Sequence, residues 1–83
     1  MTTTHLDLKG LNCPLPVLRA NKKMKELMAG DVLEVEVTDP AAPKDFETYS
    51  ATTGHEQLAS EEADGVFRIS LKKVPGFAEK RAL

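Results

Sequence analysis

The sequence predicts an α+β fold, a two-layer sandwich with two helices on one face of a mixed four-stranded sheet. Two segments carry apolar residues at helical spacing, four others have strand character, and their order is strand, helix, strand, helix, strand, strand. The alternating strands leave one sheet face polar, so both helices should cover the other face. The first two strands should be parallel, with a right-handed crossover, and the last two antiparallel.

The first strand and the first helix are separated by a glycine break. Residues 5–8 alternate polar and apolar side chains, which predicts a short half-buried strand before Gly10. After Pro14, apolar residues recur at helical spacing and define a buried helix face, which should end at Gly30. The members of this face are Val17, Ala20, Met24, Leu27 and Met28.

The second strand has the clearest pattern, because residues 32–38 alternate apolar residues with two glutamates. Its inward side chains are Leu33, Val35 and Val37. Residues 39–43 contain two prolines and should form a turn. A second helix is expected over residues 44–53 before Gly54 ends it. Its inward side chains should be Phe46 and Tyr49.

The last two strands are predicted to form a hairpin. Residues 56–63 and 66–73 flank Asp64-Gly65, a dipeptide suited to the left-handed backbone of a two-residue turn. The inward side chains of the final strand should be Phe67, Ile69 and Leu71. We therefore expect a single domain over residues 1–73, followed by a flexible C-terminal tail over residues 74–83.

Composition restricts the function classes. With 83 residues, 41% of them hydrophobic and 29% charged, the chain fits one compact domain with room for one site. It has no apolar stretch near the ~20 residues that cross a bilayer, and residues 1–5 do not have the composition of a signal peptide. We therefore expect a cytoplasmic protein that does not bind membranes. The formal charge of −2 argues against general affinity for nucleic acid.

Cys13, the only cysteine, lies where the first strand pattern gives way to the first helix. A thiolate at a helix N-terminus is stabilised by unpaired backbone N–H groups and by the helix dipole, and the thiolate is the reactive form of cysteine. Pro14 suits the first helical position, and Pro16 lies in the first turn. The residues expected to support the site around Cys13 are Gly10, Asn12, Pro14 and Pro16.

Three roles are open to a single cysteine: a buried structural residue, an intermolecular disulfide partner or a reactive thiol. Its position between Asn12 and Pro14 favours a reactive thiol. One cysteine and two widely separated histidines, His5 and His55, give no zinc-ligand spacing, so no metal is expected. His55 is expected to be an ordinary surface or capping residue.

From Leu6 to Lys73 the chain resembles the TusA family of sulfur-carrier proteins, also called SirA-like. The residues that carry the resemblance are Asp7, Gly10, Cys13-Pro14-Leu15-Pro16, Leu27 to Gly30, Thr38-Asp39-Pro40, Asp45 and Gly54-His55. The resemblance implies two helices on a four-stranded sheet. It also implies that Cys13 accepts sulfane sulfur as a covalent persulfide, with no other cofactor, and passes it to an acceptor.

The same resemblance implies partner proteins. The donor would be a cysteine desulfurase or a rhodanese-like protein, and the acceptor a DsrE-like or other protein in transfer RNA thiolation, molybdenum-cofactor synthesis or sulfur oxidation. The chain would be a sulfurtransferase-type carrier, which leaves open whether it is an enzyme by itself. Arg19, Lys22 and Lys23 begin more than a turn beyond Cys13, so we expect them to dock an acidic partner rather than to catalyse.

Two other function classes remain as alternatives. A non-catalytic regulatory or RNA-binding module is disfavoured by the few aromatic residues available for base stacking and by the negative net charge. A peroxide sensor or thiol-disulfide protein is disfavoured because such proteins often pair a reactive cysteine with a resolving one, and this chain has a single cysteine.

Overall fold

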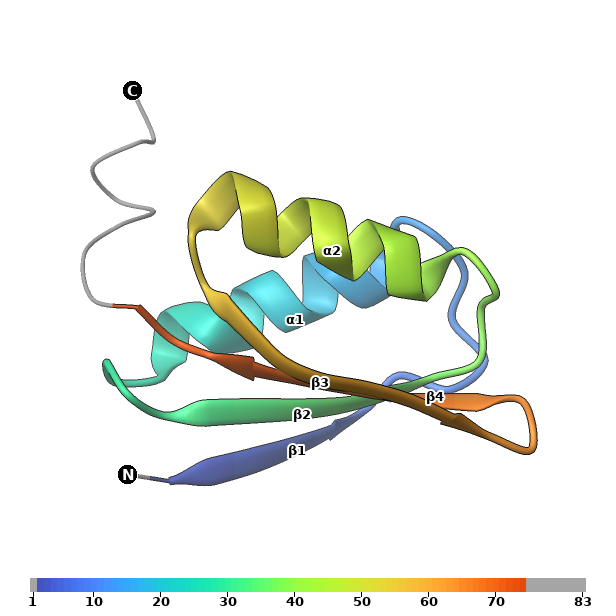
Figure 1. Ribbon diagram of the computed structural model, residues 1–83, viewed down its shortest axis with the longest axis horizontal. Coiled ribbons are helices and arrows are strands. Elements are labelled where there is room, and N and C mark those ends of the chain that lie inside the picture. Colours follow the sequence, from blue (N-terminus) through green and yellow to red (C-terminus); the bar gives the residue numbers. More distant parts are fainter. Residues whose placement is uncertain (1, 75–83) are drawn as a thin grey trace.

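The computed structural model describes residues 2–74 and confirms the predicted α+β fold (Figure 1). The elements are β1 (Thr3–Asp7), α1 (Leu15–Glu26), β2 (Val32–Val37), α2 (Ala42–Thr53), β3 (Glu56–Ala63) and β4 (Val66–Lys72). The strands form one four-stranded sheet in the order β1-β2-β4-β3, and both helices lie on the same face of it. Neither helix has the length and apolar character needed to span a bilayer.

The strand directions place two loops at one edge of the sheet. β1 and β2 are parallel, as predicted, whereas β4 lies between β2 and β3 and is antiparallel to both. Because β1 and β2 run in the same direction, the segments that follow them leave the sheet at the same end. Residues 8–14 and 38–41 are therefore neighbours, although they are far apart in the sequence.

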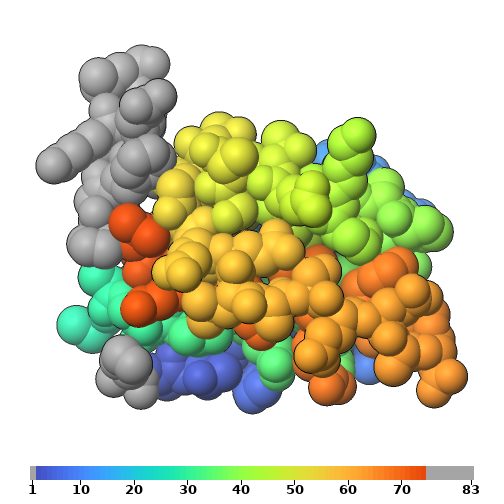
Figure 2. Space-filling model, in the orientation of Figure 1, coloured from blue at the N-terminus to red at the C-terminus, as the bar shows by residue number. Residues whose placement is uncertain are grey.

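The hydrophobic core lies between the sheet and the two helices. Leu33, Val35 and Val37 of β2 are fully buried, as their alternation with polar residues predicts, and Val35 is paired with Ile69 of β4. The core members are Leu8, Ala20, Met24, Leu33, Val35, Val37, Ala42, Phe46, Tyr49, Ile69 and Leu71. In the space-filling view, residues of β3 and β4 occupy the front of the molecule below α2 (Figure 2).

α1 ends earlier than the apolar pattern predicts. Leu27 leaves the helix with an extended backbone, φ −89° and ψ 160°. The backbone N–H of Met28 then donates to the Asp31 carboxylate at 3.0 Å. Met28 is 75% exposed, so its assignment to the buried helix face is wrong. Gly30, with φ +93°, lies in the turn before β2 and does not stop the helix.

α2 begins at Ala42, two residues earlier than predicted. Asp39 accounts for this start, because its side chain accepts the Ala41 N–H at 3.1 Å and its carbonyl accepts the Ala42 N–H at 2.9 Å. Pro43 is therefore in the first turn of the helix and not in the preceding turn. Gly54 ends α2 with a left-handed backbone, φ +85°, as expected.

The two helices are joined by one polar contact, and His55 lies beside it. The Tyr49 hydroxyl of α2 donates to Asn21 Oδ1 of α1 at 2.9 Å. His55 is only 5% exposed, which corrects its expected place on the surface, and its Nδ1 accepts the Val74 N–H at 3.1 Å. Val74 is the first residue of the predicted tail; the other nine tail residues, 75–83, lie outside the described residues.

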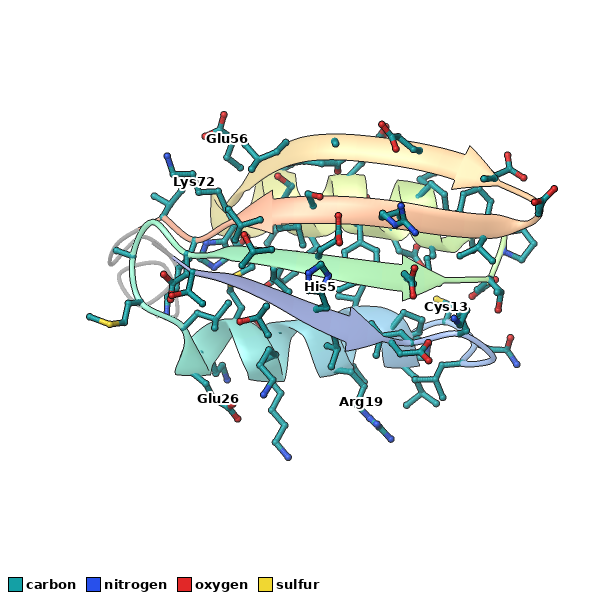
Figure 3. All side chains as sticks on the ribbon, turned by 90° about the horizontal axis from the view of Figure 1, so that it is seen from below. His5, Cys13, Arg19, Glu26, Glu56 and Lys72 are labelled. Atoms are coloured by element: carbon teal, nitrogen blue, oxygen red, sulfur yellow. The ribbon has the colours of Figure 1, made fainter. Side chains whose placement is uncertain are left out.

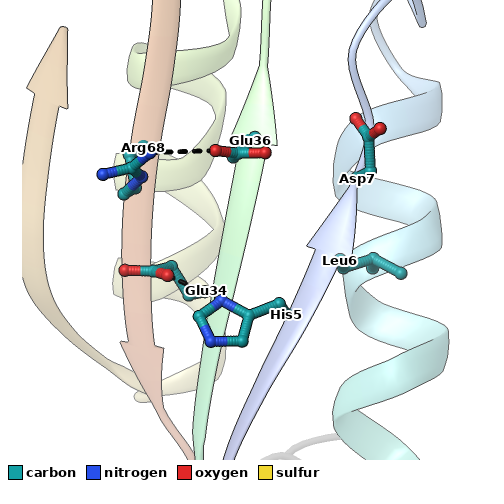
Figure 4. A pocket seen from close by; sticks show the side chains of 6 residues that line it. All are labelled: His5, Leu6, Asp7, Glu34, Glu36 and Arg68. Atoms are coloured by element: carbon teal, nitrogen blue, oxygen red, sulfur yellow. Dashed lines mark hydrogen bonds and ion pairs between the residues drawn. The ribbon is translucent and has the colours of Figure 1, made fainter.

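The uncovered face of the sheet is polar. His5 of β1 pairs with Glu34 of β2 at 2.7 Å, and Arg68 of β4 pairs with Glu36 of β2 at 3.0 Å. These side chains, with Leu6 and Asp7, line a shallow hollow on this face (Figure 4). The hydrogen bond from Arg68 and the charge of Lys9 lower the pKa of Glu36. On the sheet face that the helices do not cover, these polar side chains thus have partners on neighbouring strands.

Candidate functional site

Cys13 is exposed in the loop between β1 and α1, at the sheet edge where β1 and β2 end (Figure 3). The loop begins close to the sheet, because the Leu8 N–H donates to the Glu36 carbonyl at 2.8 Å. The peptide bond between Cys13 and Pro14 is cis. The structure therefore presents the sulfur to solvent, which agrees with a reactive thiol and not with a buried structural cysteine.

Two hydrogen bonds fasten the cysteine loop to the segment that follows β2. The backbone N–H of Cys13 donates to Asp39 Oδ2 at 2.6 Å, while Asp39 Oδ1 accepts the Ala41 N–H. One carboxylate thus joins the loop to the start of α2. The second bond runs from the Gly10 N–H to Thr38 Oγ1 at 2.9 Å. The backbone that carries the sulfur is fixed at both ends of the segment 10–13.

Acidic groups set the ionisation of the thiol. A hydrogen bond between the thiol and the Asp45 carboxylate is the largest influence, followed by desolvation and by the negative charges of Asp45 and Asp39. Together they raise the pKa of Cys13 above its usual value. This net effect is opposite in direction to the stabilisation of the thiolate expected from the start of α1.

The start of α1 has few free donors for an anion. Pro14 and Pro16 have no N–H group, and the Leu15 N–H already donates to the Asn12 carbonyl at 2.8 Å. Pro14 is the residue before the helix, with φ −97° and ψ 12°, and not its first residue as predicted. The two prolines expected to mark an anion site therefore each remove a donor from it.

The other predicted support residues do lie around Cys13. Gly10 has φ +84°, a left-handed conformation that few other residues adopt. Asn12 is exposed and contributes its backbone carbonyl to the start of α1. Pro16 is buried in the first turn of α1, as predicted.

The three basic residues predicted for docking lie on a different surface. Arg19, Lys22 and Lys23 line a groove between α1 and β1, together with Leu6, Asp7, Leu8 and Glu26. Lys23 is paired with Glu26 at 3.0 Å. Cys13 does not line this groove. The groove is therefore available to a partner protein but not to the reacting sulfur.

Sequence reasoning missed Asp39 and Asp45 as site residues, taking Asp39 as a turn residue. A signal for Asp39 was present, because it directly follows β2 as the cysteine loop follows β1, and parallel strands end at the same sheet edge. Asp45 was noted only as one of the residues that carry the family resemblance, and no strand or helix pattern placed it at the site. Its effect on the pKa of Cys13 depends on where α2 begins, which was predicted two residues too late.

Two exposed leucines lie close to the cysteine in the chain. Leu15 and Leu18, in the first turns of α1, are 41% and 56% exposed. Exposed apolar side chains beside polar ones are typical of protein-binding surfaces when they cluster. We call Leu15 and Leu18 the leucine pair.

Comparisons with known proteins agree with this geometry. A family model described as sulfurtransferase TusA matches residues 4–73. The sulfur carrier protein TusA of Allochromatium vinosum is 47% identical over 69 residues, covering 83% of this chain and 91% of the relative. The TusA of Pseudomonas entomophila is 41% identical over 68 residues, with coverages of 82% and 85%. The crystal structure of a SirA-like protein from Desulfitobacterium hafniense superposes with a TM-score of 0.73 at 29% identity, covering 89% of this chain and 99% of that one.

Proposed function

We propose that this chain, which belongs to the TusA family of sulfurtransferases, carries sulfur as a persulfide on Cys13 and transfers it to an acceptor protein. The observation that carries the proposal is the exposure of Cys13 inside the segment that matches the family. A carrier needs a sulfur that two different proteins can reach in turn. It also benefits from the absence of a second cysteine, because a neighbouring thiolate could attack the inner sulfur and expel sulfide.

In the proposed loading step, the Cys13 thiolate attacks the outer sulfur of a persulfide on a donor protein. A bond forms between Sγ and that sulfur, the sulfur–sulfur bond of the donor breaks, and its electron pair leaves with the donor as a thiolate. Unloading is the same reaction with Cys13 as the leaving group. Neither step needs an external oxidant or reductant, because the transferred sulfur keeps its oxidation state.

The proposed partners are a cysteine desulfurase or rhodanese-like donor and a DsrE-like or other acceptor protein. The leucine pair supports protein partners, since both side chains are exposed and would be buried on docking. Arg19, Lys22 and Lys23 would dock acidic side chains of a partner along their groove. The cytoplasm is the proposed compartment, where a single thiol stays reduced.

The test is sulfur transfer from a cysteine desulfurase supplied with cysteine, followed by intact mass spectrometry. We expect the chain to gain one sulfur atom, and a reductant to remove it, because a persulfide is reducible. Cys13→Ala should gain none. The proposed carrier function would be wrong if the wild-type chain gained no sulfur, or if Cys13→Ala gained as much as the wild type.

A further inference from the structure

The outer side of β1 is unpaired in the part of the chain that the structure describes, because β1 is the first strand in the order β1-β2-β4-β3. The Leu8 N–H, just beyond β1, donates to the Glu36 carbonyl at 2.8 Å, so the even-numbered residues of this segment bond to β2. In a parallel pair the bonding residues alternate along the strand. The backbone N–H and C=O groups of Thr3, His5 and Asp7 therefore point away from β2, where another strand can pair with them.

A row of basic side chains lies along this unpaired side. Arg19, Lys22 and Lys23 of α1 line the groove between α1 and β1, which we call the basic groove. Figure 3 shows α1 reaching past β1 on the side away from β2. Leu15, which is 41% exposed, lies one turn before Arg19 and continues the same helix face toward the cysteine loop. A strand added to β1 would lie beside these side chains and reach the end of the sheet that carries Cys13.

Both acidic residues of the basic groove already have basic partners. Glu26 pairs with Lys23 at 3.0 Å, and Asp7 Oδ2 lies 3.9 Å from Lys9 Nζ. The other two cations of the groove are exposed and form no ion pair with any residue that the structure describes. The groove therefore carries positive charge that is not balanced within the described chain.

These two cations, Arg19 and Lys22, decide between possible occupants. A second copy of this chain could pair its own β1 antiparallel to this one, but both α1 helices would then lie on the same face of the joined sheet. Two basic rows would face each other, and like charges repel. An extended segment with acidic side chains places opposite charges beside Arg19 and Lys22 instead, so the charge pattern favours an acidic partner.

We propose that β1 and the basic groove form a docking surface for an extended acidic segment of a partner protein, which adds to the sheet beside β1. Backbone hydrogen bonds along the unpaired side of β1 hold the segment, as in other cases of strand addition. Alternate side chains of the added strand face α1, so acidic residues at every second position meet Arg19 and Lys22. The inference rests on the proposed carrier function, which supplies the reason for such a partner.

The position of this docking surface suits a carrier. Cys13 does not line the basic groove, so a bound segment leaves the sulfur free to react with the rest of the same partner. The segment keeps that partner close to the thiol and raises its effective concentration there.

The test measures, by fluorescence anisotropy, how the full chain binds a fluorescein-labelled peptide in which glutamate and valine alternate. The wild type should bind it, and should bind a lysine-valine peptide at least roughly tenfold more weakly. Lys22→Glu should weaken binding of the acidic peptide by about the same factor, because like charges then face each other. Lys25→Glu is the matched control, since Lys25 is exposed on α1 outside the basic groove, and it should bind like the wild type.

A second arm determines whether the peptide adds as a strand. Hydrogen exchange measured by NMR should slow at the N–H groups of His5 and Asp7 when the acidic peptide is bound, and not along the outer side of β3. His5→Pro removes one outward N–H at a position where an edge strand tolerates proline, and it should weaken binding. His5→Ala, which loses the imidazole but keeps the N–H, is its control. If circular dichroism shows that His5→Pro does not fold, hydrogen exchange of the wild type decides.

Failure of the wild type to bind the acidic peptide would overturn the inference, as would equal effects of Lys22→Glu and Lys25→Glu or unchanged exchange at His5 and Asp7. A dimer in light scattering that protects the same N–H groups without peptide would assign β1 to a second copy and would also overturn it. None of these measurements involves sulfur transfer. Failure of this inference and failure of the carrier function are therefore distinguishable.

Discussion

At the scale of single residues, the site depends on contacts that bring distant parts of the chain together. Cys13 could be identified from the sequence, because a single cysteine between a strand and a helix with flanking prolines is an unusual combination. The ionisation of its thiol could not. It depends on Asp45, which is 32 positions away in the chain, and on Asp39, which also bonds to the backbone of the cysteine itself.

Gly10 supplies a residue-scale prediction. Its φ of +84° is unfavourable for residues with a Cβ, but a Cβ placed there would have no atom within 4 Å. The cost of Gly10→Ala should therefore be conformational only, about 1 to 2 kcal/mol in the free energy of unfolding. Urea denaturation measures it.

The control for Gly10→Ala is Asn12→Ala, an exposed position in the same loop, which should change stability by no more than about 0.5 kcal/mol. A Gly10→Ala variant as stable as the wild type would show that the loop does not require the left-handed conformation.

At the scale of elements, the sequence predicted the six segments and missed the C-terminal end of α1 and the start of α2. Periodicity identifies a helix but does not say which capping contact ends it. α1 ends early at Leu27, before a turn in which Asp31 binds the Met28 N–H. α2 begins early because Asp39 binds the Ala41 N–H. In both cases a nearby carboxylate accepts a hydrogen bond from a backbone N–H group, and this bond shifts the helix end away from the position that periodicity predicts.

Tyr49, which links α2 to α1, gives a pH-dependent prediction. Burial raises its pKa to about 12, compared with 10.0 for an exposed tyrosine. Between these values the unfolded chain loses the phenolic proton while the folded chain keeps it. The contribution of Tyr49 is therefore fully present below pH 10 and is lost as the pH approaches 12, by roughly 2 kcal/mol in total.

Urea denaturation at a series of pH values, in the wild type and in Tyr49→Phe, measures this loss. Tyr49→Phe should be about 1 kcal/mol less stable at neutral pH, because Asn21 Oδ1 loses its donor. The difference in free energy of unfolding between the two proteins should become smaller and then change sign at alkaline pH. If this difference in stability stayed constant from neutral pH to about pH 12, the raised pKa of Tyr49 would be contradicted.

At the scale of the whole molecule, the fold places the core, the polar surface pairs and the reactive thiol in three different regions. The helix-covered side of the sheet holds the core, the open face holds cross-strand polar pairs, and one edge holds the thiol. The layer arrangement followed from alternation and element order alone, because only one sheet face is apolar. The strand order β1-β2-β4-β3 was not predicted, since pairing between distant strands leaves no periodic signal in one sequence.

This separation predicts that partner proteins bind at the edge that carries Cys13 and not at β3 on the opposite side of the sheet. The leucine pair and Leu58 offer a matched comparison, because Leu18 and Leu58 are 56% and 48% exposed. Leu18 lies in α1 shortly after Cys13, whereas Leu58 lies on β3, the edge strand farthest from β1. Leu18→Asp places a charge on the surface that docking would bury, whereas Leu58→Asp changes a surface that docking would leave in water.

At limiting concentrations of a cysteine desulfurase, Leu18→Asp should load with sulfur roughly tenfold more slowly than the wild type. This corresponds to a loss of about 1.4 kcal/mol, in the range of one half-buried leucine. Leu58→Asp should load at the wild-type rate. Alkylation of Cys13 by iodoacetamide should be the same in all three chains, which separates docking from thiol reactivity. Equal loading by the two variants would contradict docking at the cysteine edge.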